Sequence, residues 1–427
     1  MSEITKNVIR IHNPMSALPS FSFKGIEAYS TRAMILRGGI TIVADCGNSN
    51  LLLFAHKYLQ HLGFGPDKLI LIKTSEDGDL YQAILNDKGL CARISDFIRN
   101  EGYKIEFFCT RNNIEEKFVS SLGLNWDDVI SHPSSLADIW NNKSVFRSIV
   151  KSHELEHLFP AYCIVNNAQE LDHCVIKMLY KYPELVIKRP LWASGLGMVF
   201  GDDSTITERY ISQHQGVPAD TIIERALGAD SISMSIVTMF DKGQITDRWF
   251  TEQECSRRGD SIIHEGLILG DMPNVSIHDT DWMEQVTVPL YKLVLRDHPQ
   301  LTGIVNFDCL RHDNERFILE CNARITFSTY LQEIRRVLLL ARGIVPGNGI
   351  SEVTCLIGKI VIGQDCSFEF LQTALGQTLL TDQNQSGVIP IVLGCIPNVG
   401  YFYCVAIADS YKDALGIMND ARMKLKR

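Results

Sequence analysis

The first third of the chain alternates between apolar runs of strand length and segments with helical spacing of apolar residues. After an irregular start, Gly39–Asp45 and Lys68–Lys73 are apolar runs that predict buried strands, and a third such run spans residues 105–109. Helical spacing of apolar positions over 51–62 and 92–101 predicts the helices between these strands. The order strand, helix, strand, helix, strand predicts a parallel, Rossmann-like α/β layer.

The turn Gly47–Asn50 lies where the first predicted strand meets a helix. Backbone N–H groups at a helix start can bind a phosphate. This turn lacks the spaced glycines of a dinucleotide-binding fingerprint, so a structural strand-to-helix turn is the favoured interpretation.

Two strand patterns near the C-terminal third predict a hairpin. They are Gly303–Leu310 and Arg316–Asn322, and the polar stretch His312–Glu315 between them suits a tight connection. The hairpin is of interest because it presents Asp308, Glu320 and Asn322.

Three of these polar residues are candidate metal ligands. Side chains alternate between the faces of a strand, so Glu320 and Asn322 face one way, and Leu319 and Cys321 face the other. With Asp308 on the first face, three oxygen ligands converge, and such a set suits Mg²⁺ bound together with substrate phosphates. The hairpin by itself leaves open the simpler alternative, in which these groups are solvated or bond the local backbone.

A strand that ends in a lysine and a glycine-rich turn form a candidate phosphate site. Glu184–Pro190 is an apolar strand pattern with Lys188 near its end, and Ser194, Gly195 and Gly197 follow after a few residues. The ammonium can meet a phosphate, and glycines let backbone N–H groups approach phosphoryl oxygens closely. The short turn alone is a weak signal, which the preceding lysine strengthens.

The run Thr221–Leu227 predicts another strand, which ends in an irregular link. Backbone groups at such a link can hydrogen-bond an adenine edge, and Glu224 or Asp230 can reach a ribose. The alternating pattern from Ser231 to Met239 predicts a strand of the same sheet.

Length and composition exclude several classes of function. A chain of 427 residues predicts two or three domains, and 45% hydrophobic with 21% charged residues is typical of a soluble globular protein. A net charge of −9 without a basic cluster argues against nucleic acid as the main ligand. The sequence contains no signal-peptide core and no apolar run of membrane-spanning length. The twelve cysteines form no CxxC pair, which predicts reduced thiols in a cytoplasmic protein.

One histidine pair matches a zinc motif. His153 and His157 fit the HExxH pattern of zinc peptidases, in which a helix places both imidazoles on one face. Pro160 follows closely, and no third ligand lies at a familiar spacing, so we expect a polar helix end instead.

The polar segment Trp249–His264 is a candidate region for substrate binding. Arg257 or Arg258 can clamp a substrate carboxylate through two hydrogen bonds. An ordinary exposed loop explains the segment equally well. His264 is expected to be a loop or surface histidine and not a general base.

Taken in order, these features resemble the ATP-grasp superfamily. The order is a helix with Lys143, a Val-Ile-Lys strand, a Ser/Gly loop, an Ile-Glu link and an Asp…Glu-x-Asn-x-Arg pattern, over about Asn141 to Arg342. The resemblance implies that two lysines, Lys143 and Lys188, hold the phosphates of ATP, and that a mobile loop with Ser194, Gly195 and Gly197 closes over them. It also implies an adenine hinge at Glu224 and Ala226 and a ribose contact at Asp230. It also implies magnesium ligands at Asp308, Glu320 and Asn322, and catalytic roles for Lys188 and Arg324, the latter steadying the transferring phosphoryl group.

Two positions depart from the family pattern. Ala323 replaces the proline of the Asn-Pro-Arg pattern, which is a tolerable change at a backbone position. Ser231 stands where several relatives have a ribose-binding glutamate. Either Asp230 takes that role, or the contact is lost.

The resemblance implies an α/β protein of three domains. A Rossmann-like domain over residues 1–137 precedes an ATP-grasp domain over 138–345, and a small α/β domain over 346–427 follows. Proline and glycine in close succession over Ile344–Gly349 predict the second linker.

The C-terminal segment gives a narrower resemblance. Strands are predicted near 387–393 and 401–408, with a helix after Ser410. Its glycines and apolar strands are similar to the C-terminal domain of pheganomycin-type peptide ligases.

The resemblance also implies a reaction. The γ-phosphoryl group of ATP activates a carboxylate, and an amine attacks the acyl phosphate to form an amide, with ADP and phosphate released. Expected cofactors are ATP and one or two Mg²⁺ ions, for which Mn²⁺ can substitute. Expected substrates are amino acids or short peptides, and nucleic-acid or membrane partners are not expected. Homodimers are frequent in the family, but this sequence by itself does not specify the oligomeric state.

Other reactions remain open at this stage. The acceptor can be a carrier-protein thiol, and a carboxylase or a phosphotransferase would use the same nucleotide site. A non-catalytic nucleotide sensor would be expected to lack the phosphate lysines or the metal ligands, and this sequence contains both.

Overall fold

The computed structural model describes residues 7–17, 25–74, 79–110, 113–132, 134–191, 197–228, 230–259, 261–344 and 353–426. The chain folds into two compact units. Unit 1 comprises Met1–Ser134, Gly266–Pro273 and Arg324–Arg427, and unit 2 comprises Ser135–Glu265 and Asn274–Ala323. The predicted linker after Ile344 lies outside the described residues.

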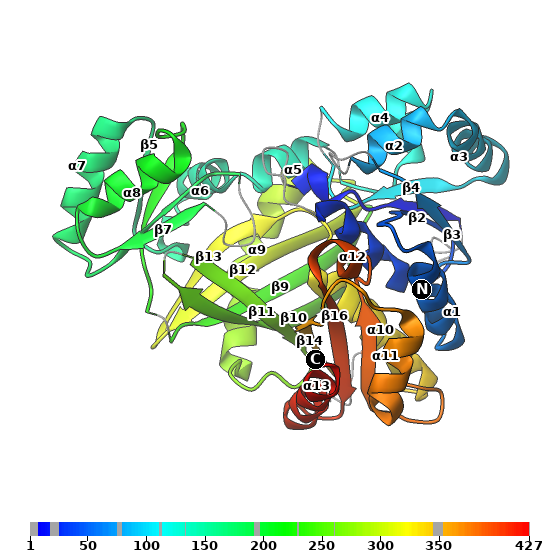
Figure 1. The fold of residues 1–427 in the computed structure, drawn as a ribbon. Helices are drawn as coiled ribbons and strands as arrows, with labels where there is room; N and C mark the ends of the chain where they lie inside the picture. Colours follow the sequence, from blue (N-terminus) through cyan, green and yellow to red (C-terminus); the bar gives the residue numbers. More distant parts are fainter. Residues whose placement is uncertain are drawn as a thin grey trace. The chain divides into compact units, whose positions relative to one another are not determined.

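Unit 1 begins with a four-stranded parallel sheet in the order β3-β2-β1-β4 (Figure 1). Its strands are β1 (Val8–Ile11), β2 (Ile40–Ala44), β3 (Lys68–Ile72) and β4 (Lys104–Phe107). Its helices are η2 (Pro14–Ala17), η3 (Ile26–Ile35), α1 (Ser49–His61), α2 (Leu80–Asn86), α3 (Lys88–Glu101), α4 (Glu115–Ser121) and η4 (Trp126–Asp128). The predicted Rossmann-like layer is therefore confirmed. The expected irregular start is wrong, because Val8–Ile11 forms a fully buried inner strand of this sheet.

The turn between β2 and α1 has a structural role. The side-chain oxygen of Asn48 accepts a hydrogen bond from the backbone N–H of Leu51 at 3.1 Å and so caps α1. Ser49 donates to Asp45 at 2.8 Å, which ties the turn to the end of β2. These contacts agree with the structural interpretation of Gly47–Asn50.

Gly39 lets β2 begin directly beside β1. Its φ is +68°, and an added Cβ would lie 2.3 Å from the backbone oxygen of Val8. We expect Gly39→Ala to lower the free energy of unfolding by about 2 kcal/mol, because the side chain adds backbone strain and a steric clash. Gly102→Ala is the matched control, since Gly102 has φ +71° but no atom within 4 Å of its added Cβ. Urea unfolding should show the smaller loss, about 1 kcal/mol, for that variant; equal losses would contradict a steric role of Gly39.

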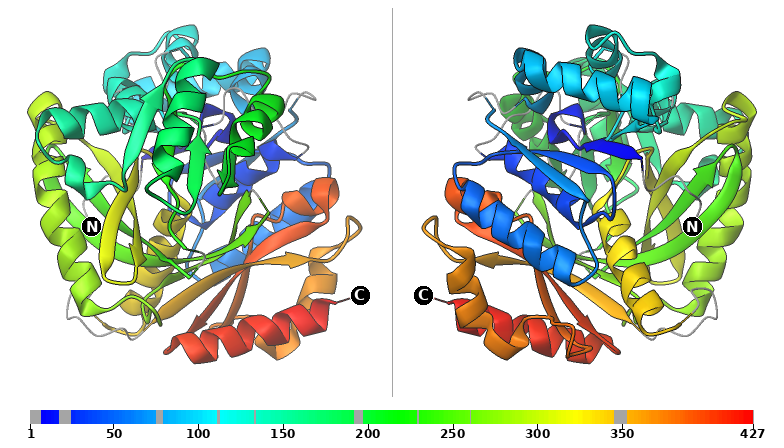
Figure 2. Two further views of the ribbon diagram at one scale, coloured as in Figure 1. Left: turned by 90° about the vertical axis from the view of Figure 1, so that its left-hand side faces the viewer. Right: turned by 90° about the vertical axis from the view of Figure 1, so that its right-hand side faces the viewer.

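The C-terminal part of unit 1 contains four further paired strands, in the order β11-β14-β16-β15, which belong to an eight-stranded sheet. Its strands are β14 (Thr354–Val361), β15 (Gly387–Ile391), β16 (Tyr401–Ala408) and the end of β11 (Ser261–Leu269), whose residues 266–269 belong to this unit. Its helices are α10 (Phe327–Ala341), α11 (Phe368–Leu375), η6 (Gly376–Thr378), α12 (Cys395–Val399) and α13 (Tyr411–Leu425). Figure 2 shows α13 packed along β14 and β16. The two strands and the final helix expected in this region are confirmed.

Unit 2 contains an antiparallel sheet in the order β13-β12-β9-β10-β11. Its remaining strands are β9 (Ile232–Asp241), β10 (Gln244–Arg258), β12 (Gly303–His312) and β13 (Glu315–Asn322). The segment Trp249–His264 is therefore not a loop, because β10 and β11 together occupy nearly all of it. Its polar side chains misled the sequence-based interpretation, since they lie on long strands.

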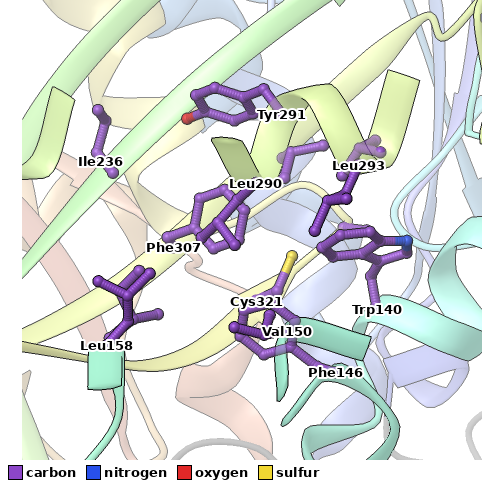
Figure 3. Packing of buried hydrophobic residues seen from close by; sticks show 14 of the residues in the cluster. Trp140, Phe146, Val150, Leu158, Ile236, Leu290, Tyr291, Leu293, Phe307 and Cys321 are labelled. Carbon is purple, nitrogen blue, oxygen red and sulfur yellow. The ribbon is translucent and has the colours of Figure 1, made fainter. Parts of the chain in front are cut away.

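One face of this sheet is covered by helices and forms the core of unit 2. The helices are α5 (Ser134–Trp140), α6 (Lys143–Ser152), η5 (Glu156–Leu158) and α9 (Ile277–Asp297). Figure 3 shows Trp140 and Phe146 packed with Leu290, Phe307 and Cys321, which come from helices and strands far apart in the sequence. Burial of these large side chains fixes which face of β12 and β13 points inward.

A smaller four-stranded sheet completes unit 2, in the antiparallel order β5-β8-β6-β7. Its strands are β5 (Tyr162–Val165), β6 (Leu185–Lys188), β7 (Met198–Gly201) and β8 (Thr221–Arg225). Helices α7 (Ala168–Leu179) and α8 (Thr205–His214) cover one face through a core that includes Leu185, Ile187 and Ile223. The other face is left for polar residues and a few apolar ones.

The zinc-peptidase motif is not formed. Helix α6 ends at Ser152, His153 lies at its C-cap, and His157 lies in the separate turn η5. The two imidazoles are therefore not one turn apart on a helix, which confirms the expected polar helix end. Among the described residues, no helix combines the length and hydrophobicity that crossing a bilayer would require.

Candidate active site

The predicted hairpin is confirmed. Strands β12 and β13 pair antiparallel through a two-residue turn, with His312 opposite Glu315. Asp308 lies directly opposite Glu320. The pairing shifts after this point, and Leu319 is the extra residue of a β-bulge. Leu319 therefore does not share the inner face with Cys321, contrary to the expectation from strict alternation.

The core on one face of the hairpin leaves the candidate ligands on the other. Phe307 and Cys321 are buried in the core, so their neighbours Asp308, Glu320 and Asn322 project from the opposite face. The Asn322 Nδ2 atom donates to Asp308 Oδ2 at 2.7 Å and to Glu320 Oε1 at 3.2 Å. The three side chains predicted to converge are therefore in direct contact.

Lys143 neutralises part of this cluster. It is the first residue of α6, a helix capped by the Asn142 side chain, and its Nζ lies 2.7 Å from Glu320 Oε2. Its side chain is almost wholly buried, and its backbone N–H donates to Pro190 O at 2.9 Å. The start of α6 thus places an ammonium on the carboxylates of a hairpin more than 150 residues away in the chain.

Three residues that the sequence did not single out hold Asp308. Its Oδ1 accepts hydrogen bonds from Ser235 at 2.5 Å, Gln253 at 3.0 Å and Asn306 at 3.0 Å. Burial and the facing Glu320 carboxylate raise the pKa of Asp308 to about 6 despite these bonds. Two carboxylates this close repel each other, and Lys143 neutralises only one negative charge, so a further cation would stabilise the pair.

A second charged cluster lies on the small sheet. Lys188 Nζ is 2.5 Å from Glu224 Oε1, and the Arg147 guanidinium contacts Glu224 Oε2. All three side chains are buried, Glu224 to 1% exposure. Burial alone would raise the pKa of Glu224, but the two cations outweigh it and hold that pKa below its usual value. Burial lowers the pKa of Lys188, while Glu224 and, more weakly, Glu320 raise it.

Helix α6 joins the two clusters, because its Lys143 contacts Glu320 and its Arg147 contacts Glu224. Arg147 was missed by sequence reasoning. It lies one helical turn after Lys143 on α6, so the i, i+4 spacing was the available signal.

The residues around Lys188 form the face of the small sheet that α7 and α8 leave uncovered. Val186, Phe200 and Ala226 make a small apolar cluster there, with Met198 and Ile262 packed against it. Alternation along β6 and β8 puts Val186 beside Lys188 and Glu224 beside Ala226. An apolar patch next to buried charges suits a flat base attached to phosphates.

Other predicted residues have different surroundings. Asp230 is exposed, with its Oδ1 3.3 Å from His312 Nδ1. Gly197 has φ +68°, a conformation that glycine adopts without strain, whereas Ser194 and Gly195 lie outside the described residues. Arg324 belongs to unit 1, with its guanidinium 5.9 Å from the centre of the Phe108 ring.

The two arginines proposed for substrate already have carboxylate partners. Arg257 bonds Glu184 through both terminal nitrogens, at 2.8 and 2.7 Å, and lies 4.3 Å above the Phe200 ring. Arg258 is exposed and contacts Glu265 at 3.2 Å. His264 is an exposed residue of β11, with its Nδ1 3.3 Å from Cys255 Sγ.

The hairpin residues fit a divalent cation. Two facing carboxylates and an amide are hard oxygen donors, the kind that Mg²⁺ prefers. Rotation of the Asn322 amide would turn its oxygen toward the site. A cation there would also relieve the repulsion that raises the pKa of Asp308. No cluster of three His, Cys, Asp or Glu side chains suited to a metal occurs in the described part of the chain, so the amide is needed as the third ligand.

Sequence comparison does not identify relatives, because no protein-family model and no curated protein sequence matches the chain. Solved structures do match over almost its whole length. The biotin carboxylase domain of the Hydrogenobacter thermophilus 2-oxoglutarate carboxylase matches with a TM-score of 0.61 and 11% identity over 98% of this chain and 90% of that one.

Two other enzymes match over nearly the whole of both chains. N5-carboxyaminoimidazole ribonucleotide synthetase from Thermus thermophilus has a TM-score of 0.57 and 11% identity, covering 98% of this chain and 99% of the synthetase. L-amino acid ligase from Bacillus licheniformis has a TM-score of 0.54 and 14% identity, covering 99% and 98%. Identities this low support a shared architecture and no more. The chain is a mixed α/β protein with the ATP-grasp fold that its motifs predicted.

Proposed function

We propose that this chain is an ATP-dependent ligase that activates a carboxylate and joins it to an amine. The observation that supports this most directly is the meeting of Asp308, Glu320 and Asn322 on one face of the hairpin, with Lys143 2.7 Å from Glu320. Lys188 belongs to the second charged cluster, which Arg147 links to the same helix as Lys143. Phosphoryl transfer depends on charge neutralisation and positioning, and this arrangement offers both.

Each residue has a proposed task. Asp308, Glu320 and Asn322 would hold Mg²⁺, which would supply positive charge near the phosphates of ATP. Lys143 and Lys188 bind phosphate oxygens, and Lys188 and Arg324 stabilise charge during transfer. The proposed phosphate contacts on the loop are Ser194, Gly195 and Gly197, and the proposed adenosine contacts are Glu224, Ala226 and Asp230. Arg257 and Arg258 remain candidates for a substrate carboxylate, which would have to displace their present carboxylate partners.

The reaction proposed is amide formation. The carboxylate takes the γ-phosphoryl group, and the amine then displaces phosphate from the acyl phosphate, so ADP, phosphate and an amide are the products. The similar L-amino acid ligase supports amino acids or short peptides as substrates, and a pheganomycin-type peptide ligase is the narrower form of this proposal. The MgADP and the dimer named for the carboxylase domain support the same nucleotide and a homodimer here.

Carboxylation is the second candidate, because the carboxylase domain was solved with bicarbonate as well as MgADP. One experiment separates the two. Purified protein is screened with ATP, Mg²⁺ and pairs of amino acids or peptides for ADP release, and products are identified by mass spectrometry. An amide product, absent when the magnesium is chelated, is expected. ADP formed only with bicarbonate would favour carboxylation, and no nucleotide turnover under any condition would refute the ligase proposal.

Magnesium binding should depend on pH. Since Asp308 has a pKa raised to about 6, it is protonated below that value and must lose the proton to bind the ion. We expect the Mg²⁺ affinity to fall by up to about tenfold per pH unit below pH 6 and to level off above pH 7. Calorimetric titration between pH 5 and 8 measures this. Asp308→Asn should bind more weakly with little pH dependence, and a flat wild-type profile would contradict the assignment.

A further inference from the structure

Unit 1 contains a buried guanidinium that has no counter-ion among the residues that the structure describes. Arg32, on η3, is 7% exposed, and its Nε is buried without a hydrogen-bond acceptor. Among the described residues, none forms an ion pair or hydrogen bond with Arg32. Burial lowers its pKa, and the next largest effects on that pKa come from Tyr330, Arg324, Tyr29 and Cys395.

Aromatic rings surround this cation. The Arg32 guanidinium carbon lies 3.9 Å from the centre of the Phe108 ring, 5.6 Å from that of Phe327 and 5.7 Å from that of Tyr330. Cation–π contacts of this kind contribute about 0.5–2 kcal/mol each, and they do not satisfy N–H donors. The cation–π contacts therefore offset only part of the cost of burying the Arg32 guanidinium.

The rings continue toward the surface. Phe327 packs against Tyr403 at 5.3 Å between ring centres, and Tyr29 hydrogen-bonds Tyr401 at 2.7 Å. These four side chains are half-buried, whereas Phe108 and Tyr330 are buried. We refer to the whole group as the Arg32 cluster, which consists of Tyr29, Arg32, Phe108, Arg324, Phe327, Tyr330, Tyr401 and Tyr403.

Further positive charge lies at the edge of the Arg32 cluster. Arg324 is half-buried and close enough to Arg32 to lower its pKa, and both guanidinium groups lie over Phe108. Lys359, on β14, is exposed, with its Nζ 3.6 Å from the centre of the Tyr401 ring. Cations thus lie at the base and at the rim of an aromatic surface.

A buried cation without a partner destabilises the folded protein. An apolar residue of similar length would fill the same space among the rings at lower cost. Residues that reduce stability in this way are typical of ligand-binding sites. The missing partner of Arg32 is therefore expected to come from a ligand.

We propose that the Arg32 cluster binds the carboxylate of an organic acid whose remaining part is apolar or aromatic. The guanidinium fork of Arg32 matches one carboxylate, and the rings of Phe327 and Tyr403 offer a surface for an apolar side group. A phosphate dianion fits less well, because it requires several donors and the surrounding rings provide few. This inference rests on the proposed function, for which it names the class of acid substrate.

The test uses the full chain and two probes of equal shape, 3-phenylpropanoate and its uncharged amide, 3-phenylpropanamide. Calorimetry should show binding of the acid and at least about tenfold weaker binding of the amide, because the amide cannot form the charge-assisted bonds. Inorganic phosphate is the third probe. Phosphate binding as strong as that of the acid would overturn the proposal in favour of a phosphate site.

Two variants separate a binding role from a structural one. Arg32→Met should weaken binding of the acid at least about tenfold and leave the melting temperature equal to or above that of the wild type, because it removes an unpaired buried charge. Arg32→Lys keeps the charge and should retain part of the binding. Arg99→Gln, which alters an exposed arginine of unit 1, is the control and should change neither.

The outcomes are distinct from those of the nucleotide assay. Full binding of the acid by Arg32→Met, or a wild type that binds Mg-ATP but not 3-phenylpropanoate, would overturn the proposal and leave the ligase assignment intact. A wild-type protein that does not bind Mg-ATP would instead refute the proposed function. A large fall in the melting temperature of both Arg32 variants would indicate that Arg32 is structural, and would likewise overturn the proposal.

Discussion

Glu320→Gln should lower the rate of Mg²⁺-dependent ADP formation at least about a hundredfold. The substitution removes one of two carboxylates offered to the ion and breaks the 2.7 Å contact with Lys143. Changes in residues that only support metal ligands commonly cost about 10–100-fold, so loss of a direct ligand should cost more. The fold should persist, because losing the Lys143 contact is offset by relief of the repulsion between Glu320 and Asp308.

The matched control is Glu315→Gln on the same strand. Glu315 is exposed and pairs with Arg225 at 2.8 Å, away from the carboxylate cluster. It should leave the rate unchanged and the far-ultraviolet circular dichroism spectrum identical. Wild-type turnover by Glu320→Gln, or an equal loss in Glu315→Gln, would show that Glu320 is not a metal ligand.

The hairpin illustrates what the sequence could predict. Strand patterns, a polar two-residue connection and alternation of side chains are local properties, and they were sufficient to bring Asp308, Glu320 and Asn322 to one face. The parallel layer of unit 1 followed from similar local signals. Strand β1 was not predicted because its four residues, Val8–Ile11, are too few to display a periodic pattern of apolar positions.

The partners of the candidate ligands could not be predicted in the same way. Ser235, Gln253 and Asn306 reach Asp308 only because β9 and β10 pair beside β12, and strand order is a property of the whole fold. The polar face of β10 resembles a loop in sequence, because neither face of that strand is uniformly apolar. Arg32 gave no signal, since an isolated arginine in a short helix is usually exposed.

Glu224→Gln should lower the free energy of unfolding by about 3–5 kcal/mol. Glu224 is 1% exposed and is the carboxylate that both Lys188 and Arg147 contact. Glutamine is neutral, so it leaves these two buried cations without a compensating negative charge. Its amide NH2 group is also a donor and cannot accept a hydrogen bond from Lys188 or Arg147. Urea unfolding followed by circular dichroism measures the loss. Because Lys188 and Glu224 also belong to the proposed nucleotide site, the proposal implies that stability and ATP binding would be coupled through this one ion cluster.

Two further variants test the physical cause of that loss. Glu265→Gln removes an exposed carboxylate that contacts Arg258, and it should change the free energy of unfolding by less than about 0.5 kcal/mol. The triple variant Arg147→Met, Lys188→Met and Glu224→Leu should recover most of the stability lost by Glu224→Gln, because apolar residues of similar volume replace buried charges at little net cost. It should nevertheless fail to bind ATP, since Lys188, the proposed phosphate ligand, is gone. If the triple variant is no more stable than Glu224→Gln, the stability loss in Glu224→Gln comes from packing and not from uncompensated charge. The cluster would then be a structural element of the small sheet, and not a set of balanced charges maintained for a nucleotide.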